Sequence, residues 1–114
     1  RIFRRLRHPN IVLFYGACVD PVSSEIVLVL EYVSGKPLGD TILGVPSEWS
    51  DVIRRCSLCN DVCCALAYLH EQTPAIIHGD IKDSNILTER FGSGCRAKLL
   101  DFGLSRLFTP HARL

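Results

Sequence analysis

The sequence contains no long apolar run and no marked excess of charge of either sign. Its unbroken apolar stretches, such as residues 26–30, are far shorter than the roughly 20 residues that a membrane-spanning helix needs. The first residues do not follow the basic-then-apolar order of a signal peptide. A formal net charge of +1 provides no field that would attract nucleic acid or an anionic membrane. We therefore expect a soluble, cytoplasmic protein without nucleic-acid partners or direct membrane contact in this segment.

Methionine is absent as well, so the chain begins at Arg1 without an initiator residue. We expect further sequence upstream, which leaves a receptor-like parent open. The 114 residues are 47% apolar and 22% charged, which is ordinary globular composition and neither disordered nor fibrous. The length is that of one domain or of part of one.

No histidine pair at zinc-finger spacing accompanies the six cysteines. Cys56, Cys59 and Cys63 instead recur at helical spacing within residues 52–66, which predicts one apolar stripe of a helix. A tetrahedral zinc site needs four ligands, and a straight helix cannot wrap them around an ion. We predict that these thiols are buried as small core side chains, and that Cys95 is the cysteine most exposed to solvent.

Hydrophobic periodicity and turn residues predict a helix end, two strands, one long helix and then a hairpin, with shorter elements between them. A turn-like stretch at residues 20–24 separates two strands that should pair in antiparallel fashion. The predicted elements are, in chain order, a helix end over residues 1–8, strands over 11–19 and 25–33, a short helix over 38–43, a helix from about Ser50 to about His70, a short strand at 76–77, and a hairpin of residues 86–88 and 97–100 with its tip at 89–96.

The motif His-Gly-Asp-Ile-Lys-Asp-Ser-Asn occupies residues 78–85, and Asp-Phe-Gly follows from Asp101. Asp80 and Lys82 stand two residues apart in a predicted extended loop, so their side chains share a face. Asp80 can accept the proton of a substrate hydroxyl, and Lys82 can stabilise the charge of a migrating phosphate. Asn85 and Asp101 offer the neutral and anionic oxygen ligands that Mg²⁺ prefers. Together these residues predict phosphoryl transfer from a metal-bound nucleotide.

These two motifs resemble those of the eukaryotic protein kinases. The resemblance covers essentially the whole chain but only part of a catalytic domain of about 250 residues. It implies an α+β, two-lobe kinase-like fold present as a fragment, with residues 1–33 as part of the small lobe and hinge, and 34–114 as the first part of the large lobe into the activation loop. The implied parts are the end of helix αC, two small-lobe strands, the hinge, a long helix, the catalytic loop and a metal-binding hairpin.

The resemblance also implies ATP and Mg²⁺ as cofactors and assigns a nucleotide site. The carbonyl of Glu31 and the backbone of Val33 would face adenine from the hinge, which needs no particular side chain. Leu30 would guard the deeper pocket, and Leu87 would form the floor under adenine. A hydrophobic spine between the lobes would consist of Phe3, Phe14, His78 and Phe102.

One position departs from the family pattern, because Gly79 stands where the family usually has arginine. In the family that arginine grips a phosphate on the activation loop, a contact that glycine cannot make. Activation-loop phosphorylation is therefore not expected to be the main switch. Lys82, two residues after Asp80, resembles the serine/threonine-specific pattern, and residues 6–18 resemble the tyrosine-kinase-like group.

The resemblance implies a protein serine/threonine kinase that transfers the γ-phosphate of ATP to a hydroxyl of a protein substrate. A pseudokinase or scaffold, or an inactive truncated remnant, is the alternative, because the Gly-rich loop, the phosphate-binding lysine and its glutamate partner lie outside this sequence. The presence of Asp80, Asn85 and Asp101 together favours the active kinase, since a scaffold has no chemical need for all three.

Overall fold

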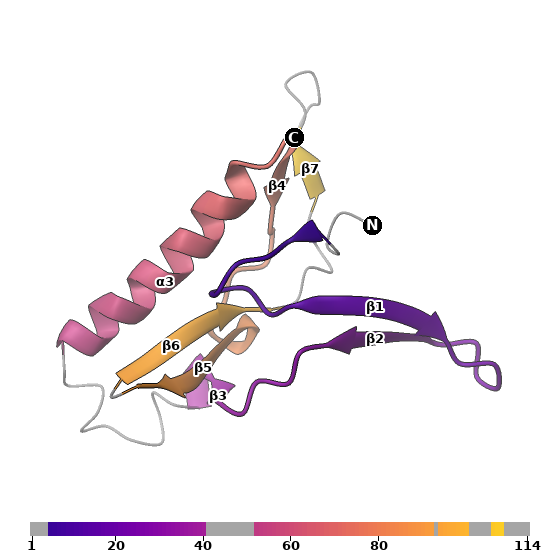
Figure 1. Cartoon of the computed structure of the whole chain (residues 1–114), viewed down its shortest axis with the longest axis horizontal. Coiled ribbons are helices and arrows are strands. Elements are labelled where there is room, and N and C mark those ends of the chain that lie inside the picture. Colours follow the sequence, from indigo (N-terminus) through magenta and orange to yellow (C-terminus); the bar gives the residue numbers. More distant parts are fainter. Residues whose placement is uncertain (1–4, 41–51, 93, 101–105, 109–114) are drawn as a thin grey trace.

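The computed structural model describes residues 5–40, 52–92, 94–100 and 106–108 of the chain. Strands precede one long helix and a hairpin, as the α+β prediction required (Figure 1). The described elements are β1 (Phe14–Val19), β2 (Ile26–Leu30), β3 (Lys36–Pro37), α3 (Val52–His70), β4 (Ala75–Ile77), the 3₁₀ turn η2 (Asp83–Asn85), β5 (Ile86–Phe91), β6 (Gly94–Leu99) and β7 (Arg106–Phe108).

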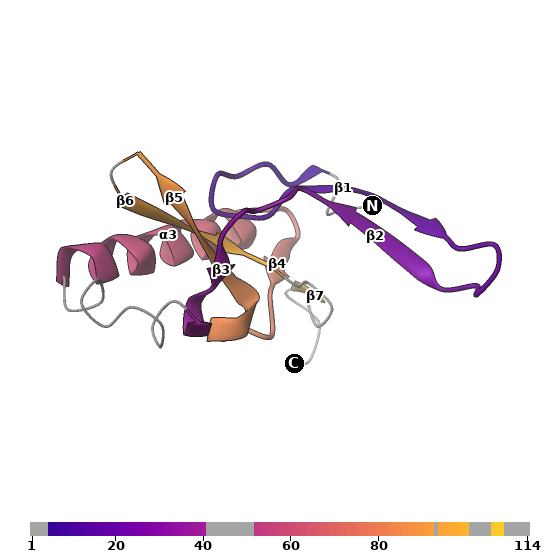
Figure 2. The ribbon, with the colours of Figure 1, turned by 90° about the horizontal axis from the view of Figure 1, so that it is seen from below.

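The strands of the described residues form three small sheets, in the orders β1-β2, β3-β5-β6 and β4-β7. All of these strand pairs are antiparallel. Figures 1 and 2 show the β1-β2 hairpin extending away from α3, while β5 and β6 cross beside the helix. Within the described residues, no helix is both long and apolar enough to cross a membrane.

The predicted pairing of the first two strands is confirmed, with Val19 opposite Ile26. Both strands are shorter than predicted. Residues 11–12 leave the hairpin and run beside β6 instead, because Ile11 forms a parallel bridge with Leu99 and the Val12 N–H donates to the Leu99 carbonyl at 3.0 Å. The beginning of the predicted strand thus connects the hairpin to the helical half of the fold.

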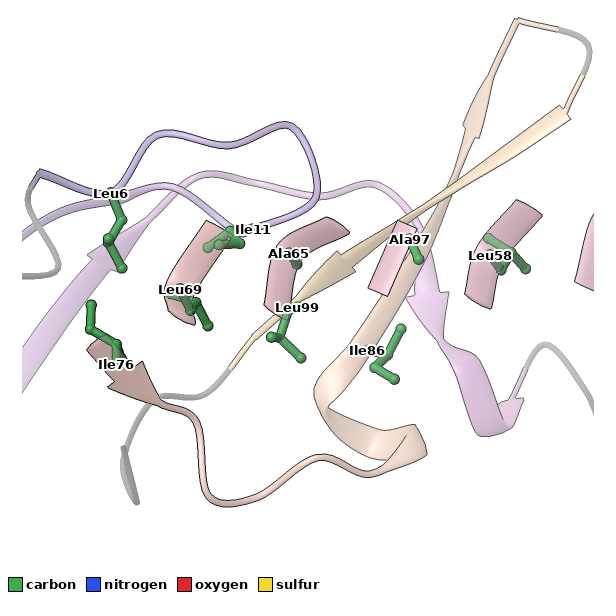
Figure 3. Close-up of a cluster of buried hydrophobic side chains, with 9 residues drawn as sticks. All are labelled: Leu6, Ile11, Leu58, Ala65, Leu69, Ile76, Ile86, Ala97 and Leu99. Carbon is green, nitrogen blue, oxygen red and sulfur yellow. The ribbon is translucent and has the colours of Figure 1, made fainter. Parts of the chain in front are cut away.

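Helix α3 packs one face against β6 and β4, and this contact makes the core. Figure 3 shows side chains from the helix, from β4, β5 and β6, and from the segment before β1 gathered in one cluster. Leu69, Ile76 and Leu99 are each 1% exposed or less. The buried members are Leu6, Ile11, Leu58, Ala65, Leu69, Ile76, Ile86, Ala97 and Leu99.

The prediction that the cysteine stripe of α3 is buried is wrong, because Cys56, Cys59 and Cys63 are all exposed. The buried side chains of the helix are Leu58, Ala65 and Leu69. At about 100° per residue, these three fall within about 40° of one another, whereas the cysteines lie about 100° to 160° away. The helix is apolar on more than one face, and the larger leucines occupy the face that meets β6.

The accompanying prediction for Cys95 is also wrong. This side chain is half-buried and packs against the core, whereas the remaining cysteines are exposed. Cys95 lies inside β6, opposite Arg90, and not in a hairpin tip. Its position in a paired strand brings it next to the core.

The β5-β6 hairpin is confirmed, but its strands are longer than predicted. Residues 89–91 pair with residues 94–96, so the predicted eight-residue tip is mostly strand. Arg96 donates to the Glu89 carboxylate at 2.8 Å, and its guanidinium lies 4.2 Å from the centre of the Phe91 ring. These cross-strand contacts extend the ladder, and Gly92 supplies the positive φ of 61° that the turn requires.

Strand β4, predicted at residues 76–77, pairs with β7, which the sequence did not predict. Helix α3 is confirmed over its described length, while its predicted start near Ser50 lies outside the described residues. The short helix expected at 38–43 is described as helix at 38–40 only. Residues 1–4 of the helix predicted at 1–8 also lie outside the described residues, as do Phe3 and Phe102 of the predicted spine. Residues 6–8 are described and are not helical, so the prediction is wrong there.

Candidate functional site

The predicted catalytic motif forms a loop that leaves β4, passes through η2 and enters β5. At its start, His78 is 1% exposed. The Asp80 N–H donates to His78 Nδ1 at 3.1 Å, so the ring proton is on Nε2, which donates to the Leu100 carbonyl at 2.9 Å. The buried imidazole therefore ties the backbone of Asp80 to the end of the β5-β6 hairpin.

Three of the predicted site residues meet at the Asp80 carboxylate. Lys82 Nζ lies 3.5 Å from Asp80 Oδ2, and Asn85 Nδ2 donates to the same oxygen at 3.1 Å. Asn85 Nδ2 also donates to the Asp80 carbonyl at 2.9 Å. Both side-chain contacts use Oδ2, and neither involves Oδ1. The side chain of Asp80 is 27% exposed and that of Lys82 is 53% exposed, so a substrate could approach both.

Asn85 is held in one orientation. Its side chain is buried, its N–H donates to the Lys82 carbonyl at 3.0 Å, and its carbonyl accepts from the Leu100 N–H at 2.8 Å. Because Nδ2 is directed at Asp80, the amide oxygen is not used in those bonds and has the neutral, hard character that suits Mg²⁺. The donor type therefore fits the expected metal.

The other predicted ligand, Asp101, lies outside the described residues. The residue before it, Leu100, is hydrogen-bonded to both Asn85 and His78. Among the described residues, no group of three or more His, Cys, Asp or Glu side chains could hold a metal ion.

The predicted hinge is attached to β6 by the side chain of Glu31. Lys98 Nζ donates to both carboxylate oxygens, at 2.9 and 3.0 Å, and the Leu13 N–H donates to Oε1 at 2.8 Å. Burial raises the pKa of Glu31, but the hydrogen bonds from Lys98 and Leu13 and the charge of Lys98 outweigh it and hold this pKa below its ordinary value. None of these bonds uses the Glu31 carbonyl, which is the atom assigned to adenine.

The remaining predicted nucleotide contacts lie on either side of this attachment. Leu30 ends β2 and is 38% exposed, and Val33 is half-buried. Leu87 is half-buried in β5, opposite Lys98 of β6. After the hinge the chain passes so close to β5 that a Cβ on Gly35 would lie 1.4 Å from the Thr88 carbonyl oxygen. This close approach brings the hinge exit beside the strand that contains Leu87.

The family model described as "Protein kinase domain" matches residues 1–114. The chain belongs to the protein kinase domain family. The α+β kinase-like fold expected from the motifs is confirmed.

Curated relatives of this kinase-domain segment occur in plants and in a social amoeba. It is 36% identical to Cold-responsive protein kinase 1 of Arabidopsis thaliana, over 96% of this chain and 28% of that protein. It is 42% identical to Serine/threonine-protein kinase CTR1 of the same plant, over 93% of this chain and 12% of that protein. It is 41% identical to Probable serine/threonine-protein kinase drkC of Dictyostelium discoideum, over 96% of this chain and 14% of that protein. The segment therefore spans between 12% and 28% of the length of these relatives.

Two residues near the site of this kinase-domain segment were not predicted from the sequence. Lys98 binds Glu31, and Asp61 of α3 accepts a hydrogen bond from the Ala97 N–H at 3.0 Å. Neither belongs to the two catalytic motifs. The sequence carries no signal that singles them out, because β6 also contains Arg96 and α3 also contains Asn60 and two arginines.

Proposed function

We propose that the protein containing this segment is an ATP- and Mg²⁺-dependent serine/threonine protein kinase that acts in signalling. The observation that carries the proposal is the Asp80 carboxylate, which Lys82 and Asn85 approach at 3.5 and 3.1 Å. The serine/threonine-kinase names of two relatives support the substrate class. So do Lys82 itself and the similarity of residues 6–18 to the tyrosine-kinase-like group.

In the proposed reaction, Asp80 orients a serine or threonine hydroxyl of the protein substrate and accepts its proton. Its Oδ1 is not used by Lys82 or Asn85, which suits it to meet the hydroxyl. Lys82 stabilises charge on the transferred phosphate. Its side chain is more than half exposed, so the ammonium group can move from Asp80 to a bound phosphate at little cost.

Asn85 and Asp101 would hold Mg²⁺, and the ion would supply positive charge to neutralise that of the phosphates. The adenine of ATP would lie between the hinge and β5. There it would contact the Glu31 carbonyl, the Val33 backbone and the side chains of Leu30 and Leu87. The amide orientation of Asn85 and the attachment of Glu31 to Lys98 support this arrangement.

We propose that residues 1–33 form part of the small lobe and the hinge, and that residues 34–114 form the first part of the large lobe. We also propose that the protein is cytoplasmic. All six cysteines are free thiols, and free thiols persist in reducing compartments. The proposal also includes control by means other than an arginine-bound activation-loop phosphate, because Gly79 has a φ of 86° and no side chain.

The test is Asp80→Asn in the full-length protein. We expect phosphate transfer from labelled ATP to a protein hydroxyl to fall by about 10² to 10⁴, the usual contribution of a positioned base. ATP binding, measured separately by calorimetry, should be retained. Asp83→Asn is the matched control, because Asp83 is an exposed carboxylate of the same loop and the amide still accepts from the Ser84 N–H.

Phosphoamino-acid analysis of the product should detect phosphoserine or phosphothreonine. Undiminished transfer by the Asp80→Asn protein would contradict the assigned base. A wild-type protein that binds ATP and transfers nothing would instead indicate a pseudokinase or scaffold.

A further inference from the structure

The outer edge of β6 is bonded by groups that do not belong to any strand. Its inner edge faces β5, in the register Thr88 to Ala97. On the outer edge, the Asn10 carbonyl accepts from the Leu99 N–H at 2.8 Å, and Asn10 Nδ2 donates to the Ala97 carbonyl at 3.0 Å. The Ala97 N–H then donates to Asp61 Oδ2 on α3, at 3.0 Å. A carboxylate thus stands where a neighbouring strand would supply a carbonyl.

The bond to Asp61 has no ready substitute. Ala97 is 1% exposed, so water cannot easily replace a lost acceptor, and an unpaired buried N–H costs about 1 to 3 kcal/mol. The acceptor is anionic, which makes the hydrogen bond stronger than one to a neutral carbonyl. Asp61 is also firmly placed, because α3 buries Leu58 on one side of it and Ala65 on the other. Figure 3 shows both of these residues beside the hairpin.

Strand β6 leads from this bond to the candidate catalytic residues. After Leu99 the chain reaches Leu100, whose N–H donates to the Asn85 carbonyl at 2.8 Å and whose carbonyl accepts from His78 Nε2 at 2.9 Å. His78 Nδ1 in turn accepts from the Asp80 N–H at 3.1 Å. Helix α3 is therefore connected to Asp80 and Asn85 through a single short strand and one buried imidazole.

We propose that Asp61 is a positioning residue of the kinase, which fixes β6 along its length and thereby fixes Asn85 and Asp80 in the catalytic loop. This inference rests on the proposed function. In this role, Asp61 of α3 controls the geometry of the reacting groups although it is distant in sequence from both catalytic motifs. Asp61 touches neither substrate nor nucleotide in this role.

The experiment compares Asp61→Ala and Asp61→Asn in the full-length protein, with Asn60→Ala as the control. Asn60 is the exposed neighbour of Asp61 on the same helix. We expect Asp61→Ala to lower kcat by about 10-fold, the low end of the loss seen when an outer partner of a site residue is removed. The KM for ATP should stay within about twofold, because Lys98 keeps both of its own bonds to Glu31 of the hinge in these variants. Asp61→Asn keeps an acceptor oxygen without the charge and should fall in between.

Amide hydrogen exchange supplies a readout that does not depend on activity. Faster exchange of Ala97 is expected in both Asp61 variants, together with faster exchange of Leu100, whose N–H bonds to Asn85. If Asp61→Ala does not fold, kcat and amide hydrogen exchange are both measured on Asp61→Asn. Asn60→Ala should match the wild type in each.

Faster exchange at Ala97 with unchanged kcat and unchanged exchange at Leu100 would overturn the proposal, since Asp61 would then only stabilise the fold. An equal loss in Asn60→Ala would overturn it as well. Failure of the proposed function is seen separately, as absence of phosphate transfer by the wild type. The exchange experiment still decides, in that case, whether Asp61 governs the loop.

Discussion

Replacing Lys98 by methionine should destabilise the kinase domain by an amount that the contacts of Lys98 allow us to work out. Lys98 is 8% exposed and binds both oxygens of Glu31, at 2.9 and 3.0 Å, with Glu89 at 3.8 Å. Removing one partner of a fully buried ion pair costs about 3 to 5 kcal/mol, because the other charge is left uncompensated. The side chain of Glu31 keeps 22% exposure, and screening by solvent at that side lowers the expected cost to about 2 kcal/mol.

The assay is thermal and denaturant unfolding of the full-length protein or of a complete kinase domain. A loss of about 2 kcal/mol corresponds to a Tm lower by roughly 4 to 8 °C for a domain of 150 to 250 residues. Lys36→Met is the control, because Lys36 is an exposed lysine of β3. A double-mutant cycle of Lys98→Met with Glu31→Gln isolates the pair itself.

The reasoning would be refuted by a Lys98→Met protein as stable as the control variant. It would also be refuted by a double mutant whose loss equals the sum of the two single losses, since the two side chains would then not be coupled. The expected result is a double mutant little worse than Lys98→Met alone, because the charge that Lys98 leaves behind is gone.

Three further outcomes follow from the structure. The pKa of Glu31 is lowered in the folded protein, so the ionised carboxylate contributes fully to stability above the ordinary glutamate pKa. That contribution is lost as pH falls through the lowered pKa. Glu31→Gln should therefore flatten the acid side of a plot of stability against pH. Gly35→Ala should cost about 3 kcal/mol or more in unfolding free energy, because the added Cβ would overlap the Thr88 carbonyl oxygen. Gly94→Ala is the control, since its Cβ would meet nothing closer than 4.0 Å. A loss in Gly35→Ala no larger than that in Gly94→Ala would contradict this prediction. Cys59→Ser should change the free energy of unfolding of the segment by less than about 0.5 kcal/mol, since the thiol is exposed, and a larger loss in urea titrations would indicate that it packs against other residues.

Much of the order of elements could be predicted from local patterns. The two strands around residues 20–24, the helix ending at His70 and the hairpin after Asn85 were all predicted from periodicity and turn residues. The catalytic motif was equally accessible, because the spacing of Asp80, Lys82 and Asn85 within one loop constrains their geometry without any distant contact.

Features that depend on distant residues could not be predicted in this way. The cysteine face and the leucine face of α3 carry similar apolar patterns, so periodicity alone could not tell which one meets β6. Hairpin length was underestimated for a related reason. Residues 89–91 are polar or charged in part, and only their pairing with 94–96 makes them strand.

The amino-acid sequence by itself determined the family, the order of the elements and the residue types of the candidate site, because motifs and periodicity are short-range properties of the chain. Only the tertiary structure decided which groups hold that site in place. The bonds of Lys98 to Glu31, and of Ala97 to Asp61, join residues 67 and 36 positions apart. Such partners are selected by packing α3 and the hinge against one hairpin, and no local pattern encodes that choice.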